Sequence, residues 1–356
     1  MASKLDLGAL TLNPEEARST NEAIFSQVWS RPSLSESHFI ATGIQMKTQI
    51  PIFGQFGLMG QVANGCTPNV SAETIVAAQK YWDPYLSQDR LVHCNADINQ
   101  LFKMWPRASK AMDTWDTPEQ ALMAFLADRL TDAMSYNIGR IAWFNDKTAK
   151  LATNGGVLTA AQDVTFWNTI DGLWKQIFAA VTATTIPAVQ YYEITENGEA
   201  SYVAQNALAS DRGLNVLRNL YNNLPAESFD TPGLKFQISR SLYLNWKDFL
   251  EDKSLVFQLS QAEQGAATDN YRGIPIIVRN DWDRIVKTYE NNGTTLNKPH
   301  RGVLSPITNI PIGTSDEGSF TSFKAFYDNV TMSHYMDTSW YLDSKLLEES
   351  KISVAF

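Results

Sequence analysis

The stretch YRGIPIIVRNDWD, residues 271–283, predicts a tight turn, a buried strand and a helix start in direct succession. Gly273 suits the turn because glycine adopts backbone conformations that other residues avoid. The apolar run after it predicts a strand, and Asp281 or Asp283 is expected to cap a short helix that follows. We find no catalytic side chain at either end of this strand. The stretch therefore predicts architecture without visible chemistry.

Helices and strands alternate around this stretch, from residue 151 to residue 315. Period-two alternation predicts strands at LKFQISR (234–240) and SLVFQLS (254–260), and helical spacing predicts helices at SDRGLNVLRNLYNNL (210–224) and SLYLNWKDFLEDK (241–253). A further helical stripe, with Gly172 inside it, consists of Trp167, Ile170, Trp174, Ile177, Phe178 and Val181. Together these segments predict a mixed α+β body.

The strongest helix signal is DTPEQALMAFLADRLTDAMSYNIGRIAWF, residues 116–144. Thr117, Pro118 and Glu119 are typical of a helix start. Apolar residues then recur three and four apart on one face. A helix over 118–143 would be about 39 Å long at 1.5 Å per residue. That length predicts a structural spine.

The composition describes a folded, acidic chain. Of its 356 residues 44% are hydrophobic, and the formal net charge is −9. An acidic chain is a poor sequence-reading nucleic-acid binder, because phosphate neutralisation needs clustered Lys and Arg. The N-terminal residues lack the apolar core of a signal peptide, and no apolar run approaches the roughly 20 residues of a membrane helix. The two cysteines form no CxxC motif, and so few cysteines in a chain of this length are typical of cytosolic proteins. We therefore expect a chain made and folded in the cytoplasm, away from membranes.

The sequence carries no recognisable catalytic or metal-binding motif. Glycines at 54, 57 and 60 suggest a phosphate loop, but no Lys-Ser or Lys-Thr follows them, so we favour an extended loop. Metal-ligand spacing is absent among the four histidines, which are His38, His93, His300 and His334. Each is expected at the surface or as a hydrogen-bonded interior residue. We predict no catalytic residue, no cofactor and no metal.

A carbohydrate-active enzyme is the alternative that the composition leaves open. Such enzymes use two carboxylates across a cleft, often beside exposed tryptophans. Adjacent carboxylates occur at Asp113 and Asp116, Asp281 and Asp283, and Glu348 and Glu349. The first two pairs precede helix starts, where capping explains them. Tryptophans at 143, 167, 174 and 246 lie on helical stripes, which predicts a place in the core.

Two N-terminal segments carry apolar side chains that need a partner to cover them. Residues 1–38 are polar apart from one small amphipathic helix, which is too short to be stable alone. The glycine-bearing loop after it is equally apolar. We expect both segments to be covered by neighbouring copies, with contact candidates Ile24, Phe25, Trp29, Phe53, Phe56 and Leu58.

The order of these parts resembles the major capsid proteins of tailed double-stranded DNA bacteriophages with the Hong Kong 97-type fold. Tyr271-x-Gly273-Ile274-Pro275-Ile276 is similar to a turn and strand late in the family's axial domain. The stretches 300–304 and 309–314 resemble the same region. The join of the spine helix to Arg140-Ile141-Ala142-Trp143-Phe144 and the ending 341–356 are similar to the family's pattern. The resemblance covers the chain from about residue 38 to residue 356.

The resemblance implies an N-terminal arm, an extended loop, a peripheral domain with the spine helix, an axial domain, and C-terminal strands that return to the peripheral domain. The corresponding ranges are 1–38, 39–97, 98–150, 151–315 and 316–356. It implies a structural subunit that forms hexamers and pentamers of an icosahedral shell around the phage genome, assembled in the host cytoplasm and found in the virion. Implied partners are further copies, a portal, scaffolding and decoration proteins, and packaged DNA held without sequence-specific binding. An encapsulin-like compartment with the same fold, or an acidic cytosolic binding protein, remains an alternative.

Overall fold

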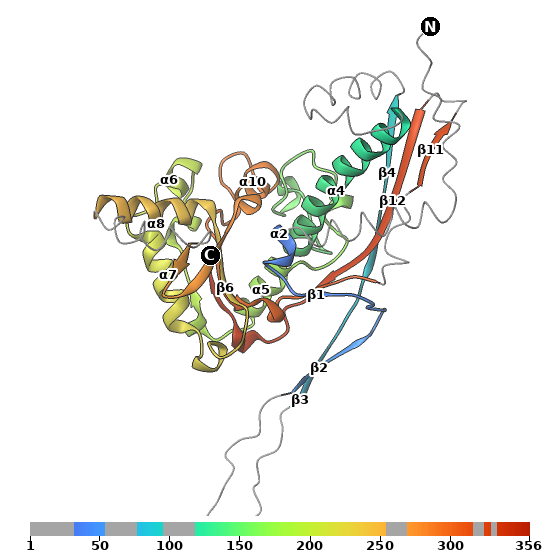
Figure 1. The fold of residues 1–356 in the computed structure, drawn as a ribbon. Coiled ribbons are helices and arrows are strands. Elements are labelled where there is room, and N and C mark those ends of the chain that lie inside the picture. Colours follow the sequence, from blue (N-terminus) through green and yellow to red (C-terminus); the bar gives the residue numbers. More distant parts are fainter. Residues whose placement is uncertain (1–31, 54–76, 95–117, 254–268, 316–323, 329–332) are drawn as a thin grey trace, which may run out of the picture.

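The computed structural model describes residues 32–53, 77–94, 118–253, 269–315, 324–328 and 333–356. A body of helices and sheets carries two projections: the long helix α4 beside a long sheet, and a narrow pair of strands that points the other way (Figure 1). This mixed architecture agrees with the α+β class that the sequence predicts.

The predicted spine is helix α4, Pro118–Phe144. From residue 131 on, where its side chains are described, Met134, Ile138 and Ile141 are buried on one face. The helix packs against strand β12 (Ser333–Ser344), where Ser344 Oγ donates a 2.9 Å hydrogen bond to the carbonyl of Ala142. A single turn of helix, α2 (Pro32–Ser35), lies against it. The sequence prediction of 118–143 is therefore confirmed to within one residue.

A six-stranded sheet forms the centre of the body, in the order β5-β13-β9-β6-β8-β7. Its strands are β5 (Tyr191–Tyr192), β13 (Ser353–Ala355), β9 (Gly302–Pro306), β6 (Leu234–Ser239), β8 (Ile274–Arg279) and β7 (Asn270–Tyr271). The predicted strands at 234–240 and 274–278 are thus neighbours, and they run parallel. The predicted strand at 254–260 lies outside the described residues.

Side-chain alternation in the central strands gives the sheet two covered faces. Val303 and Val354 join a cluster with the helices α5 and α10, whereas Leu304 and Ala355 join a cluster with α7 and α8. The helices of the body are α5 (Leu173–Thr182), α6 (Tyr202–Asn206), α7 (Arg212–Asn223), α8 (Arg240–Asp252) and α10 (Asn280–Tyr289). The predicted helices at 210–224, 241–253 and after 280 are confirmed.

Short 3-10 helices connect these elements. They are η3 (Ala152–Asn154), η4 (Val164–Phe166), η5 (Ala188–Gln190), η6 (Thr195–Gly198), η7 (Ala226–Ser228), η8 (Ile307–Asn309) and η9 (Glu349–Lys351).

The turn before β8 is the tight turn predicted from Tyr271-Arg272-Gly273. Arg272 and Gly273 both have left-handed backbones, with φ of 51° and 84°. They join β7 to β8 as a two-residue hairpin of the kind that matches strand twist. The expectation that Asp281 or Asp283 caps the next helix is wrong. Both lie in its first turn, and no side chain caps it.

The predicted helical stripe from Trp167 to Val181 is also wrong in its first half. Helix α5 begins only after Gly172, and Trp167 follows the 3-10 helix η4. A Cβ on Gly172 would stand 2.8 Å from the carbonyl carbon of Trp143, so the chain has to pass close to the end of α4 here.

A second sheet runs along α4. Strand β12 pairs antiparallel with three strands, β4 (Tyr85–Cys94), β11 (Lys324–Asp328) and β10 (Ile312–Gly313). Strand β1 (Ile40–Ala41) completes it beside β10. Strands β2 (Gln49–Phe53) and β3 (Ala77–Tyr81) form a separate antiparallel ladder. That ladder is the narrow projection in Figure 1.

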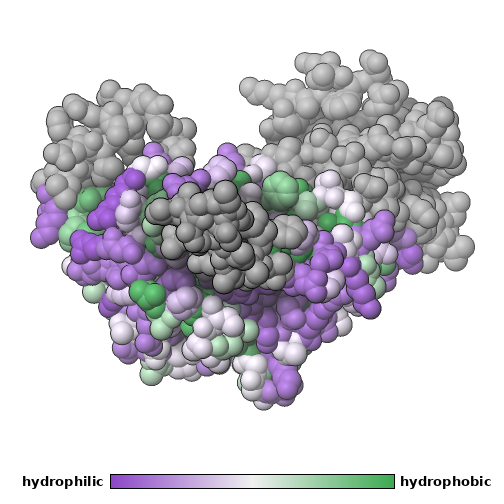
Figure 2. Space-filling model, turned by 90° about the horizontal axis from the view of Figure 1, so that it is seen from below, coloured by the Kyte–Doolittle hydropathy of each residue, from purple (hydrophilic) through white to green (hydrophobic). Residues whose placement is uncertain are grey.

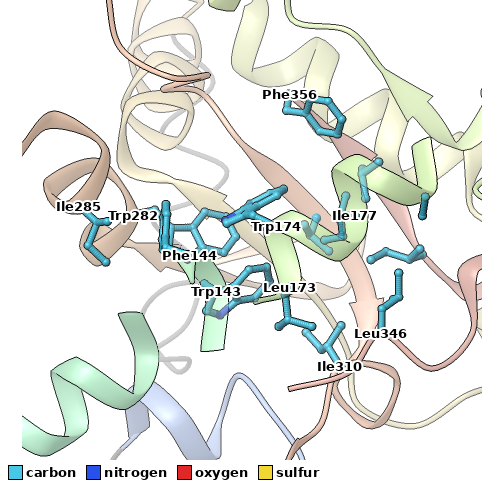
Figure 3. Packing of buried hydrophobic residues seen from close by; sticks show 14 of the residues in the cluster. Trp143, Phe144, Leu173, Trp174, Ile177, Trp282, Ile285, Ile310, Leu346 and Phe356 are labelled. Carbon is cyan, nitrogen blue, oxygen red and sulfur yellow. The ribbon is translucent and has the colours of Figure 1, made fainter. Parts of the chain in front are cut away.

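The end of the spine enters the aromatic centre of the body (Figure 3). The rings of Trp143 and Trp282 lie 4.6 Å apart, and those of Trp174 and Trp282 lie 4.9 Å apart. Phe356 packs on Phe178 at 4.7 Å. Helix α4, helix α5, helix α10 and the last strand of the chain therefore share one core.

Candidate functional site

The carboxylates considered as catalytic pairs are used in ion pairs and backbone contacts. Asp281 accepts Arg279 at 2.7 Å, and Glu348 and Glu349 pair with different lysines, Lys351 and Lys80, also at 2.7 Å. Asp283 accepts the backbone N–H of Arg240 at the start of α8, at 2.7 Å. Asp113 and Asp116 lie outside the described residues. Each of the four described carboxylates therefore already has a hydrogen-bonding partner.

Two of the four histidines are buried and hydrogen-bonded through both ring nitrogens. His38 contacts the carbonyl of Ile310 and the indole of Trp143, each at 2.9 Å. His300 contacts Ser241 Oγ and the carbonyl of Gln205, each at 2.7 Å. Burial lowers the pKa of both rings, that of His38 to about 3. Both rings are therefore neutral structural groups. This confirms, for His38 and His300, the prediction of hydrogen-bonded interior histidines.

His93 and His334 stand opposite each other in the β4–β12 ladder. Across the described ranges no cluster of His, Cys, Asp or Glu could hold a metal ion. No helix within those ranges is apolar and long enough to cross a membrane.

Every tryptophan whose side chain the structure describes is buried. Their exposed fractions are at most 7%, for Trp82, Trp143, Trp167, Trp174, Trp246, Trp282 and Trp340. A sugar-binding platform needs an exposed ring, so none of these seven serves as one. The core positions predicted for 143, 167, 174 and 246 are confirmed.

A pocket of about 320 Å³ lies between the spine and the start of α10. Its charged lining is balanced and consists of two aspartates, Asp132 and Asp281, and two arginines, Arg279 and Arg284. Arg279 is already bonded to Asp281 and to Gln237 Oε1. The pocket shows no arrangement of nucleophile and base.

The base of the β2–β3 ladder, where Trp82 follows β3, makes a defined contact with the body. Trp82, directly after β3, is 6% exposed and lies over Gly313 of β10, together with Ile44. Its backbone N–H donates to the carbonyl of Thr48 at 2.9 Å, and its carbonyl accepts the N–H of Lys47 at 2.8 Å. The same residue thus joins the ladder to the body and closes the ladder.

Polar contacts surround this base. Lys80 donates to the carbonyl of Leu346 at 2.6 Å and pairs with Glu349 at 2.7 Å. The backbone N–H of Asp83 donates to Asp343 Oδ2 at 2.7 Å, and its carboxylate pairs with Lys147 at 2.8 Å. Lys147 holds the pKa of Asp83 below its usual value. These pairs hold the strand to the body where β3 ends and β4 begins.

The β4–β12 ladder has one covered and one open face. Ser87 and Trp340 are opposite each other and buried, as is Thr338. On the other face Leu86 lies opposite Tyr341, and these side chains are 38% and 37% exposed. Further along that face Arg90 binds Asp337 through two hydrogen bonds of 2.6 and 2.8 Å. Apolar and charged side chains therefore share an open sheet surface beside the spine.

More apolar side chains are exposed near the ladder base. Met46, Tyr81 and Tyr85 are 68%, 47% and 53% exposed. On the face seen in Figure 2 the hydrophobic residues stand in small groups among hydrophilic ones. Sequence reasoning missed these three residues, because Tyr81 and Tyr85 stand singly in their strands and Met46 lies in a turn, so no period marks them as exposed.

The predicted contact residues are mostly outside the described residues. Ile24, Phe25, Trp29, Phe56 and Leu58 all fall there. Phe53 ends β2, where its backbone is paired with Ala77. The place of these six residues between copies therefore stays a prediction.

No protein-family model and no curated protein matches this sequence. Among solved structures, a chain of the satellite phage P4 procapsid, in a structure that includes the size determination (Sid) protein, is 13% identical with a TM-score of 0.50. The match covers 94% of this chain and 98% of that chain. A chain of Gordonia phage Cozz is 8% identical over 91% of this chain and 85% of its own, with a TM-score of 0.48. A chain of Mycobacterium phage Cain is 10% identical over 100% and 94%, with a TM-score of 0.46.

At such low identity it is the fold that is shared. The match to the P4 procapsid chain spans nearly the whole of both chains, so no large part of either fold lies outside the comparison. It confirms, at the level of the fold, the resemblance that the order of helix, strands and loops predicts. This mixed helix-and-sheet chain has the fold of a phage capsid protein.

Proposed function

We propose that this protein is the major structural subunit of an icosahedral phage capsid and has no enzymatic activity. The observation that carries the proposal is the fold match to a procapsid chain over 94% of this chain and 98% of that one. The seven described tryptophans and the ion-paired carboxylates support it, because none of these rings can serve as a sugar platform and these carboxylates are held in ion pairs.

In this proposal the layout is that of the Hong Kong 97-type fold. Residues 1–38 are the arm, 39–97 the extended loop, 98–150 the spine part of the peripheral domain, and 151–315 the axial domain, while 316–356 return to the peripheral domain. Strand β12 runs along α4 as that layout requires. Strand β13 lies in the central sheet of the body, so the last residues also bind the axial part.

The subunits meet as hexamers and pentamers around the packaged double-stranded DNA. Portal, scaffolding and decoration proteins are the expected partners, and the mature location is the virion. The contact candidates Ile24, Phe25, Trp29, Phe53, Phe56 and Leu58 are then covered by neighbouring copies. Their burial, with the exposed residues at the ladder base, would give the large apolar contacts that permanent assemblies use.

The mass of the native particle tests the proposal. The protein is purified from its natural source, or co-expressed with the neighbouring genes, and examined by electron microscopy and light scattering. Closed shells of megadalton mass are expected. Packaged DNA in particles from the natural source separates a phage capsid from an encapsulin-like compartment. A monomer or dimer from the natural source would contradict the proposal.

Introducing a negative charge in the predicted loop gives a sharper version of the test. Phe56→Asp should abolish shells while leaving the circular dichroism and the unfolding midpoint of the subunit unchanged. The exposed Phe166 of the body, 55% exposed, supplies a matched control as Phe166→Asp. Equal loss of shells in both variants would sink the role assigned to the loop.

A further inference from the structure

Gly313 occupies a position in the second sheet where a side chain has no room. It pairs with Ala41 of β1 and with Asp343 of β12. A Cβ on this residue would stand 2.6 Å from Ile44 Cδ1 and 2.7 Å from Trp82 Cζ3. Because the Trp82 ring is rigid, it could not remain where it is. The glycine is required here for space.

The indole seated on Gly313 belongs to the residue from which the β2–β3 ladder departs. The first rung, Gln49 with Tyr81, is adjacent to Trp82, and Tyr81 is already 47% exposed. The other wall of the seat, Ile44, is fixed by its N–H, which donates to the carbonyl of Thr314 at 3.0 Å. Of the ladder side chains that the structure describes, none is buried beyond this seat. The ladder projects from the body at this point (Figure 1).

The polar contacts around the seat differ from it in kind. The Lys80–Glu349 pair is about one-third exposed on both sides, at 30% and 33%, and the Lys147–Asp83 pair is 41% and 48% exposed. Exposed ion pairs of this sort are weak and are screened by salt. A ring that fills a space between packed strands is insensitive to salt and has a single fit. The ring therefore has one fixed place on the body, whereas these two ion pairs contribute little to the direction of the ladder.

We propose that Trp82 in the Gly313 seat is the positioning device of the projecting ladder, and that it determines how the ladder of one copy reaches the next. The second half rests on the proposed capsid function, since only an assembled shell has a neighbour to reach. Gly313 and Trp82 are positioning residues: they touch the base of the ladder and act through its direction.

The first experiment concerns the soluble subunit alone. Hydrogen exchange is followed by mass spectrometry in peptides covering 44–50 and 79–84 for the wild type, Gly313→Ala and Gly198→Ala. Gly198 is the matched control, since a Cβ there meets nothing within 4 Å and its backbone is not left-handed. We expect at least tenfold faster exchange at the ladder base in Gly313→Ala, unchanged exchange in the β6–β8 core, and no effect in Gly198→Ala. Exchange at the base within twofold of the wild type would overturn the proposal.

A second variant covers the case in which Gly313→Ala fails to fold. Trp82→Leu empties the seat and places no new atom against β10. It should accelerate exchange in the same peptides by a similar factor. The Trp82→Leu, Gly313→Ala double variant should be no faster than either single variant, because the effects share one cause. Additive effects on the exchange rate would show that the ring and the glycine act separately, and would overturn the proposal that they form one positioning contact.

The second experiment separates this inference from the capsid proposal. Shell yield and diameter are measured for the same variants under the conditions that assemble the wild type. At least a tenfold loss of regular shells is expected for Gly313→Ala, with Gly198→Ala within twofold of the wild type. If the wild type forms shells and Gly313→Ala forms them with equal yield and diameter, the positioning role is refuted and the capsid function stands. If the wild type forms no shells, the capsid function fails, and with it the assembly half of this proposal.

Discussion

The indole Nε1 of Trp143 donates a 2.9 Å hydrogen bond to Nε2 of His38, a residue 105 positions earlier in the chain. The other ring nitrogen of His38 lies 2.9 Å from the carbonyl oxygen of Ile310, so it must carry the proton. The last turn of the spine, the bend before β1 and the segment before β10 are therefore joined through one neutral imidazole.

Acid should destabilise the subunit through His38. Burial, and then the nearby Arg279, lowers the pKa of this ring from 6.5 to about 3. The unfolded chain takes up a proton below pH 6.5 and the folded chain does not, so the stability contributed by the neutral ring is complete above pH 6.5 and is lost as the pH falls toward 3. The slope from this one group is about 1.4 kcal/mol per pH unit. Urea unfolding of the wild type and His38→Gln from pH 7 to pH 4 measures it, with a shallower slope expected in the variant. Parallel curves would show that His38 titrates normally.

Asp283 should stabilise α8, although it belongs to α10. Its carboxylate accepts the backbone N–H groups of Arg240 at 2.7 Å and Ser241 at 3.3 Å, which are unsatisfied donors at the start of α8. Asp283→Ala should lower the free energy of unfolding by about 1–2 kcal/mol. The exposed Asp248 of α8 provides the control, and Asp248→Ala should cost less than about 0.5 kcal/mol. Equal losses would mean that the capping contact contributes nothing.

The buried pair of Arg301 and Glu290 should be costly to break on one side only. Their atoms are 2.6 Å apart, and the side chains are 1% and 6% exposed. Glu290→Gln leaves the guanidinium charge buried, so a loss of about 3–5 kcal/mol is expected in denaturant unfolding. Replacing both residues, as Arg301→Met with Glu290→Leu, should recover part of that loss.

The control for this pair is Lys351 with Glu348, which are 33% and 29% exposed. Lys351→Met should cost less than about 1 kcal/mol, because solvent already screens the pair. A smaller loss for Glu290→Gln than for Lys351→Met would contradict the view that burial makes the inner pair costly to break.

Phe356 should contribute as a core residue. It is 3% exposed and packs on Phe178 and Tyr191, with Lys298 Nζ 4.0 Å from its ring centre. Phe356→Ala should cost about 3–5 kcal/mol in the free energy of unfolding. The exposed Phe166, changed to alanine, should cost less than about 0.5 kcal/mol. A midpoint for Phe356→Ala equal to that of Phe166→Ala would place the ring outside the core.

Local patterns predicted those elements whose causes are local. The spine over 118–144, the turn at Arg272-Gly273 and the helices after 210 and 240 follow from apolar spacing and turn chemistry within a few residues. The prediction of one helix from Trp167 to Val181 was wrong because the apolar spacing continues on both sides of Gly172. The helix begins only after Gly172, where the chain passes close to Trp143, and that contact comes from a distant segment.

Contacts between distant segments were not predictable in this way. Asp283 has the sequence context of a cap for its own helix, yet it binds the start of α8, which only the parallel pairing of β6 and β8 brings near. The sequence around Gly313 also gives no sign that an indole ring packs on it, because that ring belongs to Trp82, more than two hundred residues away. A lone glycine in a strand indicates a close approach without naming what approaches.

The place of β13 between β5 and β9 has a consequence for synthesis. Strands β9, β6, β8 and β7 pair without β13, but β5 cannot join them, and the apolar partners of Val354 stay uncovered, until residues 353–355 have left the ribosome. Pairing between such distant segments is slow, and waiting chains aggregate. We therefore expect the yield of soluble subunit to depend on growth temperature and on chaperones that hold nascent chains.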